Sequence, residues 1–223
     1  MKSRIWIAFT VILTVATLVG GLLTLRRVHV DVRSTAKHEF VIDESMPRVR
    51  KILVRTNAAK KIVAMADAEL LDQDWLNLKF EMERPLLARD RDWNLNGNGE
   101  MVVQFHDGYL GSHQLALLQS IEIVPEQLEV SNGLREPSGP IEEYRSQIKL
   151  VPDGKGRAKF QTSLALRIKT TANWLTQRTV ERNINQSAAQ SLRNQEQAIR
   201  EVVQEHANEL LILPEFDRDE STN

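Results

Sequence analysis

The histidines are the side chains of this 223-residue chain best suited to metal binding or proton transfer. The five are His29, His38, His106, His113 and His206. No two stand in an H-E-x-x-H motif or four residues apart on a predicted helix, the spacings that bring two imidazoles to one metal ion. Cysteine is absent, which excludes thiolate ligands, cysteine nucleophiles and disulfides. We predict no metal site and no cofactor, and interpret the histidines as structural or solvent-facing.

Two other patterns that could support catalysis have simpler interpretations. Gly97 and Gly99 lack the Lys-Ser/Thr pair of a phosphate-binding loop, and their context predicts a hairpin or loop turn. Glu81 and Glu83 share one face of a predicted strand. The alternation turns that face away from the core, whereas general acid catalysis needs a buried or paired carboxyl. We therefore predict no catalytic residue.

Alternation of apolar and polar residues predicts strands over much of the chain. One apolar face is expected in each of the segments 28–42, 76–82, 101–106, 121–130, 144–151 and 160–168. In the second segment Leu76, Leu78, Phe80 and Met82 are expected to face the core. Strands with a single apolar face are typical of an antiparallel sheet that is covered on one side.

Helices are predicted at three places. Ser45 suits an N-cap and Pro47 a first helical turn, so one short helix follows the first strand, and a second starts near Ala58. Residues 171–211 carry a long amphipathic pattern without proline. Its apolar stripe consists of Val180, Ile184, Ala188, Leu192, Ile199, Val202 and Val203. The predicted fold class is α+β, with the long helix packed on a curved antiparallel sheet.

This order of elements resembles the helix-grip superfamily, also called START-like or SRPBCC, which includes polyketide cyclases and lipid-transfer domains. Residues 40–53 look like its opening strand and proline-started helix, residues 123–130 like its mid-sheet bend, and residues 151–156 like its penultimate hairpin. The resemblance covers about residues 28–208. It implies a cavity between sheet and long helix that often holds an apolar ligand. No universal catalytic motif exists in the superfamily, so no active residue is carried over.

The apolar faces of the predicted elements supply the candidate lining residues of such a cavity. They are Phe80, Phe105, Tyr144 and Phe160 on the strands, and Ile184 and Ala188 on the long helix. Tyr144 is the candidate whose hydroxyl could orient a ligand, although a tyrosine at the rim of the sheet accounts for the pattern equally well.

The first segment of the chain has the properties of a membrane anchor. Residues 5–25 contain no charged side chain, and a helix of that length reaches about 30 Å, the thickness of the hydrocarbon core. We predict a single-pass anchor over residues 1–27, a helix-grip domain over 28–213 and a polar, acidic tail over 214–223. A cleaved signal peptide is the alternative, but the apolar run exceeds the usual length of about 7–15 residues. Basic residues flank both ends of the run, which leaves the orientation open.

Composition narrows the function classes. The chain has 29 Lys+Arg against 30 Asp+Glu, a formal net charge of -1, whereas proteins held on nucleic acid by their overall field are basic. We expect no nucleic acid partner. The leading hypothesis is a membrane-tethered domain that binds an apolar or amphipathic small molecule or lipid. The alternatives are a cyclase- or hydrolase-type enzyme on the same fold, and a non-catalytic membrane-associated interaction protein with a filled core.

Overall fold

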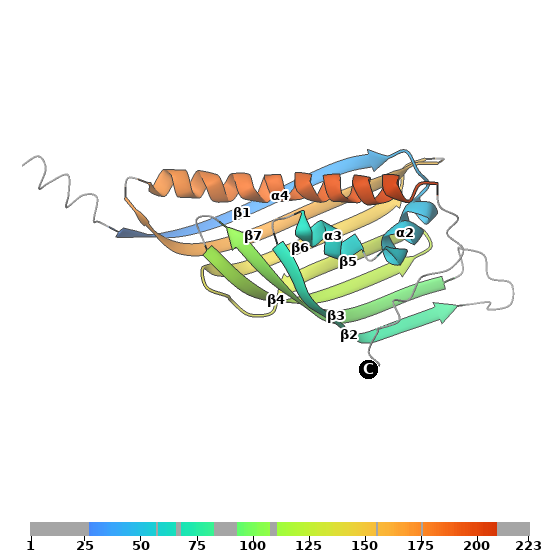
Figure 1. Ribbon diagram of the computed structural model, residues 1–223, viewed down its shortest axis with the longest axis horizontal. Helices are drawn as coiled ribbons and strands as arrows, with labels where there is room; N and C mark the ends of the chain where they lie inside the picture. The colour runs from blue at the N-terminus through green and yellow to red at the C-terminus, as the bar shows by residue number, and fades with distance from the viewer. Residues whose placement is uncertain are drawn as a thin grey trace, which may run out of the picture.

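The computed structural model describes residues 27–56, 58–65, 68–82, 93–107, 111–154, 156–174 and 176–208, with backbone alone at 80–82, 93 and 107. The elements are β1 (Arg27–Ile42), α2 (Met46–Arg55), α3 (Ala58–Ala64), β2 (Ala68–Met82), β3 (Trp93–Asp107), β4 (Gly111–Val124), β5 (Gln127–Leu134), β6 (Ile141–Pro152), β7 (Ala158–Asn173) and α4 (Gln177–Glu205) (Figure 1). Within the described residues no helix is both long and apolar enough to span a bilayer. The predicted anchor over residues 5–25 and the tail over 214–223 lie outside them.

The seven strands form one antiparallel sheet in the order β1-β7-β6-β5-β4-β3-β2. Consecutive strands from β2 to β7 are neighbours, and β1 pairs with β7 at the other edge of the sheet. A two-residue turn joins β4 to β5, where Val124 pairs with Gln127. Between β6 and β7, Gly154 and Gly156 adopt φ values of 71° and 88°, which glycine reaches without a Cβ clash. β1 and β2 are thus the edges of the sheet.

Helix α4 lies along one side of the sheet, against β1 and β7 (Figure 1). Its 29 residues contain neither proline nor glycine and extend about 44 Å at 1.5 Å per residue. The side chains that it buries recur at helical spacing: Ile184, Ala188, Leu192, Ala198, Ile199, Val202 and Val203. The stripe predicted from the sequence is therefore the face that α4 presents to the sheet, except that Val180 is half-buried.

The largest core cluster forms where α2 and the second half of α4 meet the sheet. Phe40 and Phe160 pair across β1 and β7, and their rings stack with centroids 4.8 Å apart. Leu150 of β6, Val49 of α2 and Val203 of α4 are fully or almost fully buried beside them. We call this region the covered end. Most of its side chains are enclosed by strands and helices.

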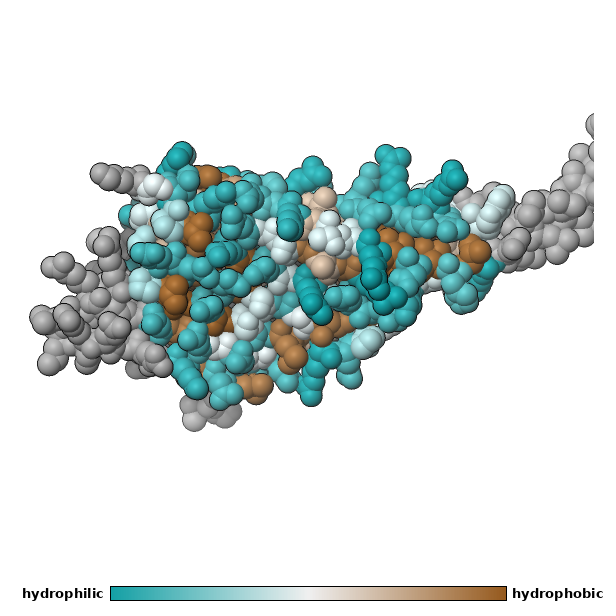
Figure 2. All heavy atoms as spheres, turned by 180° about the vertical axis from the view of Figure 1, so that it is seen from behind, coloured by the Kyte–Doolittle hydropathy of each residue, from teal (hydrophilic) through white to brown (hydrophobic). Residues whose placement is uncertain are grey.

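The outer face of the sheet is polar. Seen from behind, most of the surface is hydrophilic, with scattered hydrophobic patches (Figure 2). On the outer side of β1 and β7, Asp31 pairs with Arg167 at 2.7 Å and Glu39 with Lys159 at 2.6 Å. The alternation thus separates an inner, helix-facing face from a solvated outer face, as predicted.

The structure corrects the predicted start of the long helix. The pattern placed it near Thr171, but β7 continues to Asn173 and α4 begins at Gln177. Thr170 and Thr171 instead pair with Val30 and His29 of β1. Threonine is β-branched and suits a strand, and the long edge strand β1 offers backbone partners that extend the ladder.

The structure also corrects two predictions for β2 and β3. Leu76 and Leu78, expected to face the core, are 59% and 55% exposed. β2 is the edge strand farthest in the sheet from β1 and β7, where α4 lies, so the long helix does not cover it. Gly97 and Gly99, expected in a turn, lie inside β3 opposite Leu78 and Trp75. The register of β2 shifts between Trp75 and Asn77, and there its backbone approaches β3 closely. Position 99 therefore requires glycine, because a Cβ there would lie 2.4 Å from the Asp74 carbonyl oxygen.

Candidate functional site

Antiparallel pairing aligns inner-face side chains into rows that cross the sheet. One row joins Gly97, Ile121, Val130, Ile148, Thr162 and His38 from β3 to β1. The next row joins Gly99, Gln119, Asn132, Ser146, Leu164 and Ala36. Each row contains one residue from each of six neighbouring strands, so residues far apart in the sequence become lateral neighbours.

The middle of this inner face lies away from the main helix contacts. Among the described residues, contacts between helices and sheet are concentrated on β1, β2, β6 and β7. Leu95, Ile121, Val130 and Ile148 are consequently only half-buried, although they occupy the centre of the sheet and touch the covered end. Apolar side chains in such a position expose surface that a ligand could remove from water.

Uncharged polar side chains lie beside these apolar groups. Gln119 and Ser146 are 7% and 9% exposed. The Gln73 amide donates to the Gln119 Oε1 atom at 2.8 Å, and the Asn132 amide donates to the Ser146 hydroxyl at 3.2 Å. Within the described part of the chain, the Asn132 Oδ1 atom is buried without a hydrogen-bond partner. An acceptor in that state can receive a hydrogen bond from a ligand hydroxyl or amide.

Tyr144 stands at the edge of the polar row. It packs against the cluster of Leu164, Ala188 and Leu192 beneath α4. Burial raises the pKa of its phenol, and a hydrogen bond with Ser146 offsets that only in part. The hydroxyl therefore stays neutral over the physiological range and can both donate and accept. We call Leu95, Ile121, Val130, Ile148, Gln119, Asn132, Ser146 and Tyr144 together the central surface.

The six predicted lining residues are distributed over several clusters. Phe160 lies in the covered end, Phe105 packs with Met101 and Val103, and Ile184 packs with Val30 and Ile168. Tyr144 shares one cluster with Ala188 and a second with Phe105, so the structure brings these three candidates into neighbouring clusters. For Phe80 the structure describes only the backbone, which pairs with Leu95. Whether any of the six touches a ligand stays a prediction.

Sequence reasoning missed Gln119 and Asn132. A signal for the first was present, because Leu115, Leu117, Gln119, Ile121 and Ile123 alternate strictly, which sets an amide in phase with buried apolar residues. A polar residue on a core-facing phase needs a partner, so it is a candidate for recognition. Asn132 carries the same signal over a shorter strand, because it is in phase with Leu128, Val130 and Leu134.

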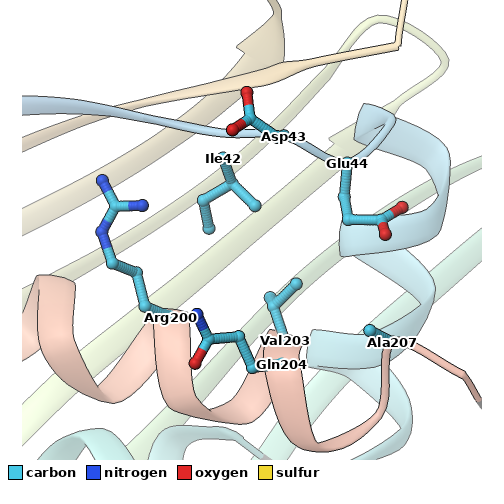
Figure 3. A pocket seen from close by; sticks show the side chains of 7 residues that line it. All are labelled: Ile42, Asp43, Glu44, Arg200, Val203, Gln204 and Ala207. Carbon is cyan, nitrogen blue, oxygen red and sulfur yellow. The ribbon is translucent and has the colours of Figure 1, made fainter.

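A separate pocket of about 250 Å³ lies between the start of α2 and the last turns of α4. It is lined by Ile42, Asp43, Glu44, Arg200, Val203, Gln204 and Ala207 (Figure 3). Arg200 and Glu44 lie on opposite sides, with Ile42 and Val203 between them. Its walls carry charges of both signs, and it is partly open to solvent. Such a pocket is small and polar compared with sites for drug-sized apolar ligands.

An acid–base pair links α4 to β1 beside the central surface. His38 Nε2 lies 2.5 Å from Glu196 Oε2, and Arg200 donates to Glu196 Oε1 at 2.7 Å. The Arg200 guanidinium also lies 5.2 Å from the centre of the Phe40 ring. Burial raises the pKa of Glu196, but hydrogen bonds from His38 and Arg200 outweigh it and leave the pKa below its ordinary value. The pair holds α4 in place, and its geometry is also that of a histidine general base oriented by a carboxylate.

No group of three or more His, Asp or Glu side chains that could bind a metal ion comes together in the described segments.

Comparisons with known proteins find similarity at the level of solved structures. No family model matches the sequence, and no curated protein matches it. The chain is similar to the Zhui aromatase/cyclase from a Streptomyces species (6% identity, 78% of this chain and 96% of that one, TM-score 0.48). It is also similar to a protein from Thermus thermophilus (12%, 78% and 99%, 0.47) and to a START superfamily protein from Mycobacterium smegmatis (11%, 77% and 97%, 0.45). At these identities and TM-scores the similarity carries no conclusion about a family, a ligand or a reaction.

Proposed function

We propose that the domain binds an apolar or amphipathic small molecule or lipid on its central surface. The observation that carries the proposal is the pairing of half-buried apolar groups with uncharged polar groups on the inner face, away from the main helix contacts. A filled core offers neither exposed apolar area nor an unsatisfied acceptor such as the Asn132 Oδ1 atom.

The two kinds of side chain have different roles in this proposal. Ile121, Val130 and Ile148 supply affinity at roughly 25 cal/mol for each Å² of apolar area that the ligand removes from water. Asn132 and Ser146 fix the orientation of the ligand through hydrogen bonds. The row from Gly99 to Ala36 contains no charged side chain. The part of the ligand that meets this row is therefore uncharged, because an unpaired buried charge is strongly unfavourable.

We further propose that residues 5–25 hold the domain at a membrane as a single-pass anchor. Support comes from the uncharged run and its length. A tethered binding domain differs from a diffusing carrier, because its ligand is taken from or delivered to one membrane. The side of the membrane on which the domain lies stays open, since both flanks of the run are basic.

A pair of variants on one strand tests the binding proposal. Ile121 lies on the inner face of β4, and Leu118 lies on the same strand, 47% exposed on the outer face. Ile121→Trp fills the central surface, whereas Leu118→Trp adds the same volume outside. Native mass spectrometry of the detergent-extracted protein should show a co-purified small molecule in the wild type and in Leu118→Trp. The dissociation constant should rise about tenfold in Ile121→Trp, which corresponds to about 1.4 kcal/mol of binding free energy, and the bound fraction should fall accordingly.

The same experiment separates the alternatives. A wild-type protein that carries no small molecule, and that takes up none from a lipid mixture, would favour the interaction-protein alternative. The His38–Glu196 pair is the observation that supports the enzyme alternative. If a bound molecule changes mass over time in the wild type but not in His38→Gln, the domain is an enzyme and the pair is its acid–base group.

A further inference from the structure

The short connection between the predicted anchor and β1 determines which end of the domain lies nearest the membrane. The apolar run ends at Leu25, and β1 begins at Arg27, two residues later. Two residues of fully extended chain span only about 7 Å. The headgroup layer on each side of the hydrocarbon core is of similar thickness, roughly 5–8 Å. The first residue of β1 therefore has to lie at the headgroup layer if residues 5–25 span the bilayer.

Strand pairing brings a second segment to the same end. Arg27 pairs with Asn173, the last residue of β7, and Trp174 follows directly. The Thr176 amide donates to the Asn173 carbonyl at 2.9 Å, which turns the chain into α4. Figure 1 shows the start of β1, the end of β7 and the start of α4 together at one end of the molecule.

The side chains at this end are of the types found at membrane interfaces. Trp174 is 49% exposed, although a large aromatic side chain is normally buried in a soluble domain. Arg27, Arg178 and Arg182 are also exposed. Tryptophan prefers the interface because its ring is amphipathic, and arginine binds lipid phosphates. Glu181 is the acidic residue nearest them in the sequence, and it accepts a hydrogen bond from Gln177.

The arginines at the start of α4 run against the usual rule for helix stability. The first turn of α4 contains no acidic residue, and Arg178 places a positive charge at the positive end of the helix dipole. Arg182 lies one turn further along the same face. Residues that break a local rule in this way are expected at functional sites, so the two arginines are candidates for a binding role.

We propose that Arg27, Trp174, Arg178 and Arg182 form a docking surface that lies against a bilayer containing anionic lipids. The indole of Trp174 lies among the headgroups, and the three guanidinium groups contact their phosphates. This inference rests on the proposed anchor, because the two-residue connection to the apolar run is what brings the surface to the membrane. The docking surface then fixes the orientation of the domain relative to the bilayer.

The absence of cysteine makes a direct test practical, since a single introduced cysteine can be labelled selectively in the full-length chain. Trp6→Cys, Trp174→Cys and Leu118→Cys are each labelled with an environment-sensitive fluorophore and reconstituted into phosphatidylcholine vesicles with phosphatidylserine. Leu118 is the matched control, because it is 47% exposed and lies on β4. A nitroxide quencher on the lipids reports how close each label lies to the bilayer.

We expect quenching at position 174 to exceed that at position 118 about threefold or more, as for an interfacial side chain. Reversing the charges with Arg178→Glu and Arg182→Glu should reduce that difference, because the connection to the anchor still brings this end to the bilayer but the arginines no longer hold it against the phosphates. Arg193→Glu, an exposed position farther along α4, should leave it unchanged.

The outcomes separate this inference from the anchor itself. Quenching at position 6 with no excess at position 174 leaves the anchor standing and overturns the docking surface. An absence of quenching at position 6 overturns both. If quenching at 174 is unchanged by charge reversal and by leaving phosphatidylserine out of the vesicles, the assignment of anionic lipids to the arginines is wrong.

Discussion

The covered end and the central surface lie on the same face of one sheet, yet they are packed differently. In the covered end, Phe40, Leu150 and Phe160 meet α2 and α4 and are almost completely buried. In the central surface, Val130 and Ile148 come from adjacent strands in the same alternating phase and remain half-buried. Strand periodicity is thus the same in both regions. The side chains differ in burial because α2 and α4 pack over one region more than over the other.

This comparison separates stability from binding. A residue surrounded on all sides contributes transfer free energy and avoids a cavity, so its loss destabilises the fold. A residue left half-exposed contributes less to folding and has apolar area that a ligand can still cover. We therefore expect substitutions at the covered end to act on unfolding and substitutions in the central surface to act on binding.

The largest expected effect concerns Phe160. Phe160→Ala removes one ring of the stack with Phe40 and leaves a cavity in a fully buried site, which should lower the free energy of unfolding by about 3–5 kcal/mol. Ile148→Ala, on the neighbouring strand and the same face, should lower it by about 1–2 kcal/mol while weakening ligand binding. Urea denaturation of the two variants measures the difference. Equal losses would mean that the central surface is as closely packed as the covered end.

An intermediate effect on stability is expected at Gly97 and Gly99 of β3. Gly99→Ala should lower the free energy of unfolding by about 1–3 kcal/mol, because its Cβ would lie 2.4 Å from a backbone oxygen that cannot move easily. At Gly97 the nearest atom is the Leu78 Cδ2 at 2.6 Å, the end of a flexible and exposed side chain. Gly97→Ala should therefore cost less than about 1 kcal/mol. A larger loss at Gly97 than at Gly99 would contradict the bulged register of β2.

The smallest effect is expected at the His38–Glu196 pair, on the boundary between the two regions. The pKa of Glu196 is lower in the folded protein than in the unfolded chain, so its contribution is present above the unfolded pKa and is lost as the pH falls through the folded one. Glu196→Gln should destabilise the protein by about 1 kcal/mol at neutral pH. The difference from the wild type should vanish in acid, below the ordinary glutamate pKa of 4.5.

The control for this measurement is Glu143→Gln, because Glu143 pairs with an Arg145 side chain that is 75% exposed. That variant should change stability by less than about 0.5 kcal/mol at any pH. A Glu196→Gln effect that stays constant from neutral to acid pH would show that packing rather than charge holds α4 at this point.

Much of the fold could be predicted because neighbouring residues carry the information. The strand phases of β1, β6 and β7, the proline in the first turn of α2 and the stripe of α4 are all local patterns. Leu76 and Leu78 follow the same alternation but are exposed, because exposure at an edge strand depends on which helix reaches it. Gly97 and Gly99 have the composition of a turn but lie inside a strand, because distant residues of β2 approach them closely.

The candidate site was predicted less completely than the fold. Tyr144 could be chosen from its phase, but the grouping of Gln119, Asn132 and Ser146 depends on the lateral register of β4, β5 and β6. Phe160 satisfied the same criterion as Tyr144, and the structure places it in the covered end instead. The position of a residue in the alternating pattern of a strand predicts which face of the sheet its side chain lies on. The residues beside it on neighbouring strands determine what it can bind.

The amino-acid sequence by itself determined the period of each element, the polarity of each face and the uncharged run that precedes the domain. These follow from the repeat lengths of helices and strands and from the hydration of side chains, which act within a few residues. Only the tertiary structure decided that α4 lies over β1 and β7, that the centre of the inner face stays half-exposed, and that Trp174 and Arg27 lie at the same end. Those arrangements depend on contacts between residues that are distant in the sequence, such as Arg27 with Asn173 and His38 with Glu196, and their free energy is gained when the whole sheet and its helices pack together.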